Sequence, residues 1–298
     1  MEAGLIRTFF AKLLEALRFG SASPKAEISE PEERRRESFS VISEGIPIKG
    51  EIVFPSAKPA RLFPGLIICH GIPGSGAERP PDDPGYEGLA TEFSSLGLAT
   101  VIFNFRGCGE SGGSFDMMGW TRDLEVVLDH VRNTPHIDPS RILVLGFSGG
   151  GAASVYVAAQ TTEMYGLAVV GTPAHFRIFD RDPVDIVDDF RQRGIIRSLD
   201  FPPDVTRWLK AFEEIEPRRW VAHFKGKHLL IVHGDQDELI PLEHARELYD
   251  AAPRGITELS IIPGGEHRLR TNRQCLDLLK SWFLGVLGWR RPAGPSQT

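Results

Sequence analysis

The sequence is poor in the features that hold small secreted proteins together. Only three of its 298 residues are cysteine, and Cys69, Cys108 and Cys275 show neither CxxC nor cysteine–histidine spacing. An odd number of widely separated cysteines argues against a disulfide framework and against a structural zinc site. The cysteine content therefore favours a reducing compartment.

Long hydrophobic runs are also lacking. No apolar stretch reaches the length of about 18 residues that a membrane-spanning helix needs. Charged residues such as Arg7, Lys12 and Glu15 interrupt the N-terminal region, whereas a signal peptide has a continuous apolar segment. These two observations predict a cytoplasmic protein.

An excess of positive charge is missing as well. The chain carries 34 Lys and Arg against 40 Asp and Glu, which gives a net charge of -6. Nucleic-acid binding depends on a surplus of basic side chains that neutralise phosphates. We therefore expect no nucleic-acid partner.

What is present is typical of a globular protein of one or two domains. Hydrophobic residues make up 41% of the chain and charged residues 25%. Composition and periodicity divide it into an N-terminal amphipathic helix (1–20), a linker (21–36), a core (37–173 and 227–288), an insertion (174–226) and a tail (289–298).

The N-terminal segment has apolar residues at helical spacing within residues 4–19, which predicts an amphipathic helix. We favour packing of this helix on its own domain or on a second subunit of a homo-oligomer. Contact with a membrane or a partner is the alternative, and only the basic residues of the helix support it. The proline-containing, charged stretch at 21–36 predicts a linker.

From residue 37 onward, short apolar runs alternate with helical patterns. The runs at 62–71, 98–105, 141–147 and 228–234 are rich in Val, Ile and Leu. This composition is typical of strands whose two faces are both covered by crossover helices. The pattern predicts an α/β fold with a mostly parallel sheet and helices on both faces. The interval 174–226 is too long for a bare loop and predicts a small helical insertion.

Two stretches match the G-x-S-x-G pattern of a nucleophile elbow, one around Ser148 and one around Ser111. An elbow leads directly from a buried strand into a helix, with small residues beside the nucleophile because the turn is sharp. Ser148 meets these conditions, since the strand pattern RILVLGF precedes it and GGAASVYVAAQ follows. Ser111 lies several residues beyond its strand, so we expect Ser148 to be the nucleophile.

A serine hydroxyl needs a base, and the base needs a third group that fixes its tautomer. His267 follows a predicted strand and two glycines, and Asp237 follows the predicted strand HLLIVHG. Asp235 is the rival carboxylate, but its place next to Gly234 is typical of a turn cap. We therefore predict a triad of Ser148, Asp237 and His267.

Attack on a carbonyl also needs donors for the oxyanion. The loop HGIPG at 70–74 follows an earlier strand, and its glycines allow close approach of the backbone. We predict the backbone amides of Ile72 and Gly149 as the donor pair. His70 and Cys69 are adjacent, and neighbouring strand residues point to opposite faces, so both are interpreted as structural.

Four motifs together resemble the α/β-hydrolase superfamily over residues 37–288. They are HGIPG, NFRGCGESGG, GFSGG, and HGDQDELIP with the later GGEH. NFRGCGESGG is similar to the R-G-x-G-x-S-x-G segment of the branch that includes serine aminopeptidases and dienelactone-hydrolase-like and cinnamoyl or feruloyl esterases. In such relatives it forms a loop near the site, which implies a non-catalytic role for Ser111. The resemblance implies that the insertion is the family's cap.

Departures from other branches narrow the resemblance. Ser148 stands where dienelactone hydrolases have cysteine and where haloalkane dehalogenases and epoxide hydrolases have aspartate. The HGGG loop of the hormone-sensitive-lipase branch is missing.

The resulting expectation is a serine hydrolase without metal or cofactor. It would cleave small to medium carboxylic esters through an acyl-enzyme. A peptidase or amidase would use the same triad, and a non-catalytic binding protein on this fold is a third reading. The last reading predicts a lost triad member, and none is missing from this sequence.

Overall fold

The computed structural model of the chain describes residues 34–56, 62–74, 83–176 and 182–289. The predicted N-terminal helix, most of the predicted linker and nearly all of the tail lie outside these residues. Within the described parts of the chain, no helix has the length and apolar character needed to cross a bilayer.

The described strands form one sheet in the order β1-β2-β4-β3-β5-β6-β7-β8. They are β1 (Arg36–Ser43), β2 (Ile46–Val53), β3 (Phe63–Cys69), β4 (Ala99–Phe103), β5 (Ile137–Phe147), β6 (Gly166–Val170), β7 (His228–Gly234) and β8 (Thr257–Ile262). Only β2 runs antiparallel to its neighbours, β1 and β4, and the other pairings are parallel. The predicted mostly parallel sheet is confirmed.

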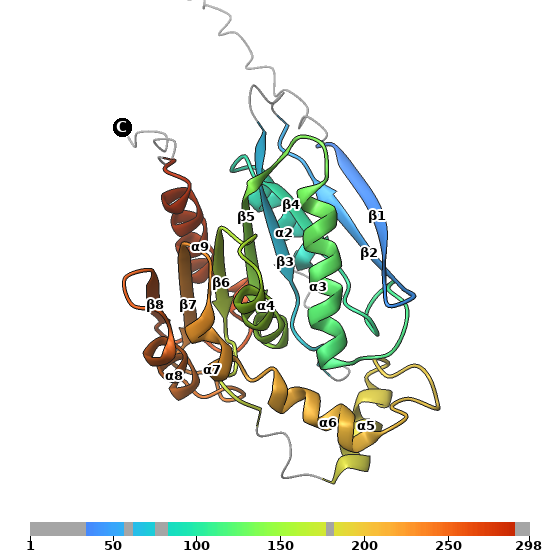
Figure 1. The fold of residues 1–298 in the computed structure, drawn as a ribbon. Coiled ribbons are helices and arrows are strands. Elements are labelled where there is room, and N and C mark those ends of the chain that lie inside the picture. Colours follow the sequence, from blue (N-terminus) through green and yellow to red (C-terminus); the bar gives the residue numbers. More distant parts are fainter. Residues whose placement is uncertain (1–33, 57–61, 75–82, 177–181, 290–298) are drawn as a thin grey trace, which may run out of the picture. The chain divides into compact units, whose positions relative to one another are not determined.

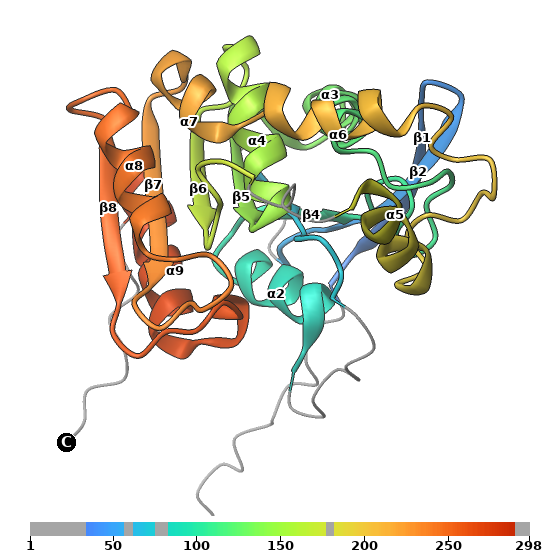
Figure 2. The same cartoon turned by 90° about the horizontal axis from the view of Figure 1, so that it is seen from below.

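Helices cover both faces of this sheet. These helices are α2 (Gly85–Ser94), α3 (Met117–Arg132), α4 (Gly149–Gln160), α8 (Glu243–Ala251) and α9 (Arg273–Val286). Figures 1 and 2 show α3 and α4 on one face, and α2 and α9 on the other. Two short 3-10 turns, Val221–His223 and Leu269–Thr271, complete this set.

Alternation within the central strands explains the two layers. In β3, Leu66 and Ile68 pack in one hydrophobic cluster with α2 and α9, whereas Ile67 and Cys69 pack in the other cluster with α3 and α4. Successive strand side chains point to opposite faces, so a strand with helices on both sides must be apolar throughout. The continuous apolar runs of the sequence follow from this packing.

The segment between β6 and β7 contains α5 (Pro183–Gln192), α6 (Val205–Glu214) and the short α7 (Pro217–Trp220). We call residues 174–226 the cap. Its helices pack on the loop before α3, where Phe115 accepts a hydrogen bond from Trp208 Nε1 at 3.0 Å. The Phe115 ring also contacts Phe190 edge-on, with ring centroids 5.0 Å apart. The cap is therefore tied to the core by aromatic packing.

The first hairpin begins earlier than the sequence predicts. β1 starts at Arg36, inside the predicted linker, and β2 starts at Ile46. The turn residues Glu44 and Gly45 both have positive φ, 49° and 82°, which is the backbone of a tight two-residue hairpin turn. Arg36 pairs with Val53 across the hairpin, so strand pairing overrides the charged composition.

Candidate active site

Ser148 occupies a strained turn between β5 and α4. Its φ of 50° and ψ of -120° lie outside the regions that side-chain-bearing residues usually adopt. Close backbone contacts hold this turn. A Cβ atom at Gly150 would lie 2.2 Å from the His70 carbonyl oxygen, and one at Gly146 would lie 2.5 Å from Gly151 Cα. Glycine is therefore required on both sides of Ser148.

Three polar side chains from different loops meet at this turn. His267 Nε2 lies 3.1 Å from Ser148 Oγ, and His267 Nδ1 lies 2.8 Å from Asp237 Oδ2. Asp237 also accepts hydrogen bonds at Oδ1 from the backbone N–H groups of Leu239 and Ile240, at 3.0 and 2.8 Å. The structure thus brings together the three residues that the sequence analysis predicted as a triad.

The electrostatics of Asp237 fix the orientation of the imidazole. Burial raises the pKa of this carboxyl. The hydrogen bonds from His267 and from the Ile240 amide together lower the pKa by more than burial raises it, so the net pKa lies below its ordinary value. The side chain has no exposed surface. A carboxylate can only accept, so Nδ1 of His267 carries a proton and its Nε2 is free to accept one from Ser148.

The sheet places these loops side by side. Ser148 follows β5, Asp237 follows β7 and His267 follows β8. Parallel strands end at the same edge, and ligands of open α/β sheets bind beyond the carboxyl ends. The site therefore lies where this architecture predicts it.

The predicted oxyanion loop passes directly over the nucleophile. A Cβ atom at Gly71 would lie 3.1 Å from Ser148 Cβ, and one at Gly149 would lie 3.6 Å from the Ile72 backbone nitrogen. Gly149 is the first residue of α4, and the N–H groups of a helix's first turn have no partner within the helix. The amides of Ile72 and Gly149 thus lie next to one another beside Ser148.

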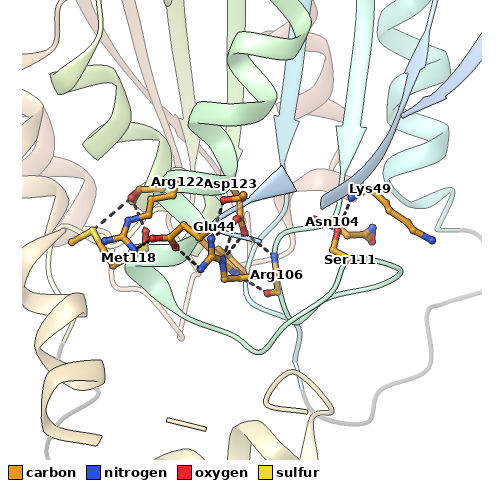
Figure 3. A network of polar contacts seen from close by, with 11 residues as sticks. Glu44, Lys49, Asn104, Arg106, Ser111, Met118, Arg122 and Asp123 are labelled. Carbon is orange, nitrogen blue, oxygen red and sulfur yellow. Dashed lines mark hydrogen bonds and ion pairs between the residues drawn. The ribbon is translucent and has the colours of Figure 1, made fainter. Parts of the chain in front are cut away.

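The rival serine has a different environment. Ser111 is 1% exposed, and its hydroxyl accepts the Lys49 backbone N–H at 2.9 Å and donates to the Asn104 carbonyl. Figure 3 shows Ser111 between these two residues, apart from the charged group around Arg106. Its hydrogen bonds hold a loop against β2.

The rival carboxylate also has a backbone partner. Asp235 accepts a hydrogen bond from the Gly264 N–H at 2.7 Å, which joins the loop after β7 to the loop after β8. It therefore fixes the turn that carries His267 into place.

A cavity of about 1230 Å³ opens onto Ser148 and His267. Much of its wall is apolar: Ile72, Phe147, Val170, Ile186, Phe190 and Leu239. Two of these residues belong to α5 of the cap. The cavity exceeds the range of about 300 to 1,000 Å³ that is common for small-molecule sites.

Charged groups at the cavity are mostly paired. Asp189 and Arg193 form an ion pair at 2.5 Å across one turn of α5. Arg270 binds both carboxylate oxygens of Asp83. Glu247 from α8 lies 3.7 Å from His175 Nε2. Within the described ranges, no group of three or more His, Cys, Asp or Glu side chains is arranged to hold a metal ion.

Three histidines have surroundings that the sequence did not predict. His244 lines the cavity and accepts the Ala174 N–H at 3.0 Å. His70, interpreted as structural, also lines the cavity. His233 was not predicted to lie near the site. It is fully buried, with Nε2 2.7 Å from the Ile240 carbonyl and 3.4 Å from Asp237. The sequence signal available for His70 and His233 was the His-Gly dipeptide, which occurs both after β3 and in β7.

Similar proteins include both esterases and peptidases. The prolyl oligopeptidase family matches residues 87–288, which is more than half of the chain. A monoacylglycerol lipase from Mycolicibacterium smegmatis is 24% identical over 291 residues, covering 85% of this chain and 98% of that protein.

Solved structures give the same picture. Est1E from Butyrivibrio proteoclasticus with bound ferulic acid superposes with a TM-score of 0.61 at 20% identity, over 84% of this chain and 97% of that one. A puromycin-hydrolysing peptidase from Mycobacterium tuberculosis gives 0.66 at 19% identity, over 90% and 42% of the two chains. The chain thus has the α/β-hydrolase fold that the sequence motifs predicted, and it belongs to the prolyl oligopeptidase family of serine hydrolases.

Proposed function

We propose that this hydrolase cleaves carboxylic esters of small to medium size through an acyl-enzyme on Ser148. The observation that carries the proposal is the continuous hydrogen-bonded chain from Ser148 through His267 to Asp237 at the mouth of a largely apolar cavity. A nucleophile, a base and an orienting carboxylate in this order are the parts that acyl transfer requires.

In the first half-reaction, Ser148 Oγ attacks the ester carbonyl while His267 Nε2 accepts its proton. Asp237 stabilises the imidazolium that forms and keeps Nδ1 protonated. His267 then donates its proton to the departing alcohol. In the second half-reaction, His267 takes a proton from the water that attacks the acyl group. It then returns this proton to Ser148 Oγ as the Oγ–acyl bond breaks and the acid leaves.

The tetrahedral intermediate carries its negative charge on the former carbonyl oxygen. The backbone amides of Ile72 and Gly149 would donate to this oxygen. The loss of one donor in a comparable site costs about 3 to 4 kcal/mol. Because both donors are backbone groups, their placement depends on the loop at 70–74 and on the start of α4.

The choice of esters is supported by the cavity and by relatives. The apolar wall suits an acyl chain or an aryl group, and relatives include a lipase of monoacylglycerols and an esterase holding ferulic acid. A peptidase is the second candidate, favoured by the family match and by the puromycin-hydrolysing peptidase.

The decisive test is the substitution Ser148→Ala. We expect it to abolish hydrolysis of short p-nitrophenyl esters and labelling by a fluorophosphonate probe, because the nucleophile is removed. Ser111→Ala is the matched control, since it removes the other serine of a G-x-S-x-G stretch, and it should leave both signals in place. Activity retained by Ser148→Ala would overturn the assignment.

Substrate class is a separate measurement. We expect kcat/KM to be higher for p-nitrophenyl esters than for aminoacyl p-nitroanilides. Faster turnover of the anilides would select the peptidase reading, with the same residues in the same roles.

A further inference from the structure

His70 lies at the start of the loop that passes over Ser148. It follows β3 directly, and its ring lines the cavity. A Cβ atom on the next residue, Gly71, would lie 3.1 Å from Ser148 Cβ and 3.7 Å from Ser148 Oγ. The loop backbone and the nucleophile are therefore in contact, and a small movement of the loop changes the surroundings of Oγ.

Both ring nitrogens of His70 are bonded to backbone groups. Nδ1 lies 2.8 Å from the Gly71 carbonyl oxygen, and Nε2 lies 3.1 Å from the Phe105 amide nitrogen. A carbonyl only accepts and an amide N–H only donates, so the ring is neutral with its proton on Nδ1. Burial favours the same form, because it lowers the pKa of His70 to about 4.

The Nδ1–H bond acts on the oxyanion donor through a single peptide plane. The Gly71 carbonyl and the Ile72 N–H belong to the same peptide group, which is planar and trans, so they point in opposite directions. A bond that holds the carbonyl oxygen therefore fixes the direction of the Ile72 N–H. The preceding peptide is held as well, since the Gly71 N–H donates to Tyr86 Oη at 3.4 Å.

The other end of the imidazole is attached to a firmly held segment. Phe105 stacks on Trp120 with ring centroids 4.3 Å apart, and the His70 ring packs edge-on against both. The next residue, Arg106, bonds the buried carboxylate of Asp123 through its backbone N–H and its guanidinium (Figure 3). The imidazole cannot turn without breaking one of these contacts.

From these contacts we infer that His70 is a positioning residue that fixes the peptide plane aiming the Ile72 N–H at the oxyanion. The inference rests on the proposed function, because an oxyanion forms only when Ser148 attacks a carbonyl. The effect of His70 passes through the peptide between Gly71 and Ile72, and not through the reacting atoms.

Two substitutions separate the two bonds of the imidazole. His70→Asn keeps an N–H donor near the position of Nδ1, and His70→Gln keeps an acceptor near the position of Nε2. We expect His70→Gln to lower kcat about 10- to 100-fold with KM unchanged, since a misplaced donor weakens only the transition state. His70→Asn should retain most of kcat, because the Gly71 carbonyl is still held.

Hydrogen exchange gives a readout that does not depend on turnover. Amides of residues 70–74 should exchange faster in His70→Gln than in His70→Asn. The matched controls are His130→Gln and His130→Asn, because His130 is also partly buried and packs on an aromatic ring, that of Phe39, at 4.6 Å. Both should keep the wild-type kcat, KM and loop exchange, and thermal unfolding checks that all four variants are folded.

Three results would count against this role. If both His70 variants kept the wild-type kcat while Ser148→Ala was inactive, His70 would not position the donor and the proposed function would stand. If the two variants lost kcat equally, with a higher KM and a lower Tm, the histidine would be merely structural. If Ser148→Ala remained active, the proposed function and the role of His70 would fail together.

Discussion

At the scale of single residues, His70 binds a proton less readily in the folded protein than in the unfolded chain. Its pKa is lowered from 6.5 to about 4 by burial. Between these two values the unfolded chain binds a proton at this position and the folded chain does not. The free energy of unfolding therefore falls as the pH decreases through this window.

Replacing His70 by Gln should remove this part of the pH dependence. The difference between the two pKa values corresponds to about 3 kcal/mol of unfolding free energy between pH 7 and pH 4. Urea unfolding at several pH values should show a shallower acid-side loss for His70→Gln than for the wild type. Other groups with lowered pKa, Asp237 and His233 among them, titrate in both proteins and cancel in the comparison. Parallel curves would contradict the expected effect.

The candidate triad could be predicted from sequence because each member lies in the loop or turn that follows an apolar strand run. Tyr86 and His233 could not, because their roles arise from tertiary contacts. Tyr86 Oη reaches the Gly71 amide from α2, and His233 contacts the carbonyl of Ile240 behind Asp237. Neither contact leaves a local pattern.

At the scale of elements, the loop between β4 and α3 depends on one buried cation. Arg106 is 4% exposed and donates to Asp123, which has no exposed surface, and also to Glu44 and Ser43. Figure 3 shows Arg106 lying between Glu44 and Asp123. This loop carries Phe105, the partner of His70, so its anchoring bears on the candidate site.

Arg106→Met should lower the free energy of unfolding by about 3 to 5 kcal/mol, because the buried Asp123 carboxylate loses its cationic partner and keeps only the hydrogen bond from the backbone N–H of residue 106. Denaturant unfolding measures this directly. Adding Asp123→Leu should recover most of the loss, since no unpaired charge remains. Lys210→Met, which breaks the exposed pair with Glu214, is the control and should cost less than about 1 kcal/mol. An equal loss in the single and double variants would show that the charge is not the cause.

Elements were predictable where burial on both faces leaves an apolar run, as in β3, β5 and β7. The start of β1 was assigned to the linker because its side chains alternate between exposed and half-buried positions and its first residues are charged. Only the pairing with β2 makes Arg36 a strand residue. The helical character of the cap segment followed from its length, but its packing did not.

At the scale of the whole molecule, Phe115 joins the cap to the core. It is fully buried, and its ring contacts Trp120 of α3 together with Phe190, Trp208 and Phe212 of the cap. The Phe115 backbone also accepts from Trp208 Nε1 and donates to the Ile195 carbonyl. Cap and core therefore share one hydrophobic cluster.

Phe115→Ala should lower stability by about 3 to 5 kcal/mol, the usual range for a buried phenylalanine. Because cap and core share the cluster, calorimetry of the wild type should show a single unfolding transition. This transition should lie at a higher temperature than that of the variant. Leu199→Ala is the control, since this cap side chain is 88% exposed and its removal should change little. A separate low-temperature transition of the cap in the wild type would show that the two parts unfold independently.

The crowded elbow around Ser148 also affects which changes the chain tolerates. A methyl group at position 150 would collide with the His70 carbonyl, while the Ser148 side chain itself opens onto the cavity. The reactive position is thus sterically freer than its neighbours. Replacing the Ser148 oxygen by the sulfur of a cysteine should therefore disturb the structure less than replacing either flanking glycine.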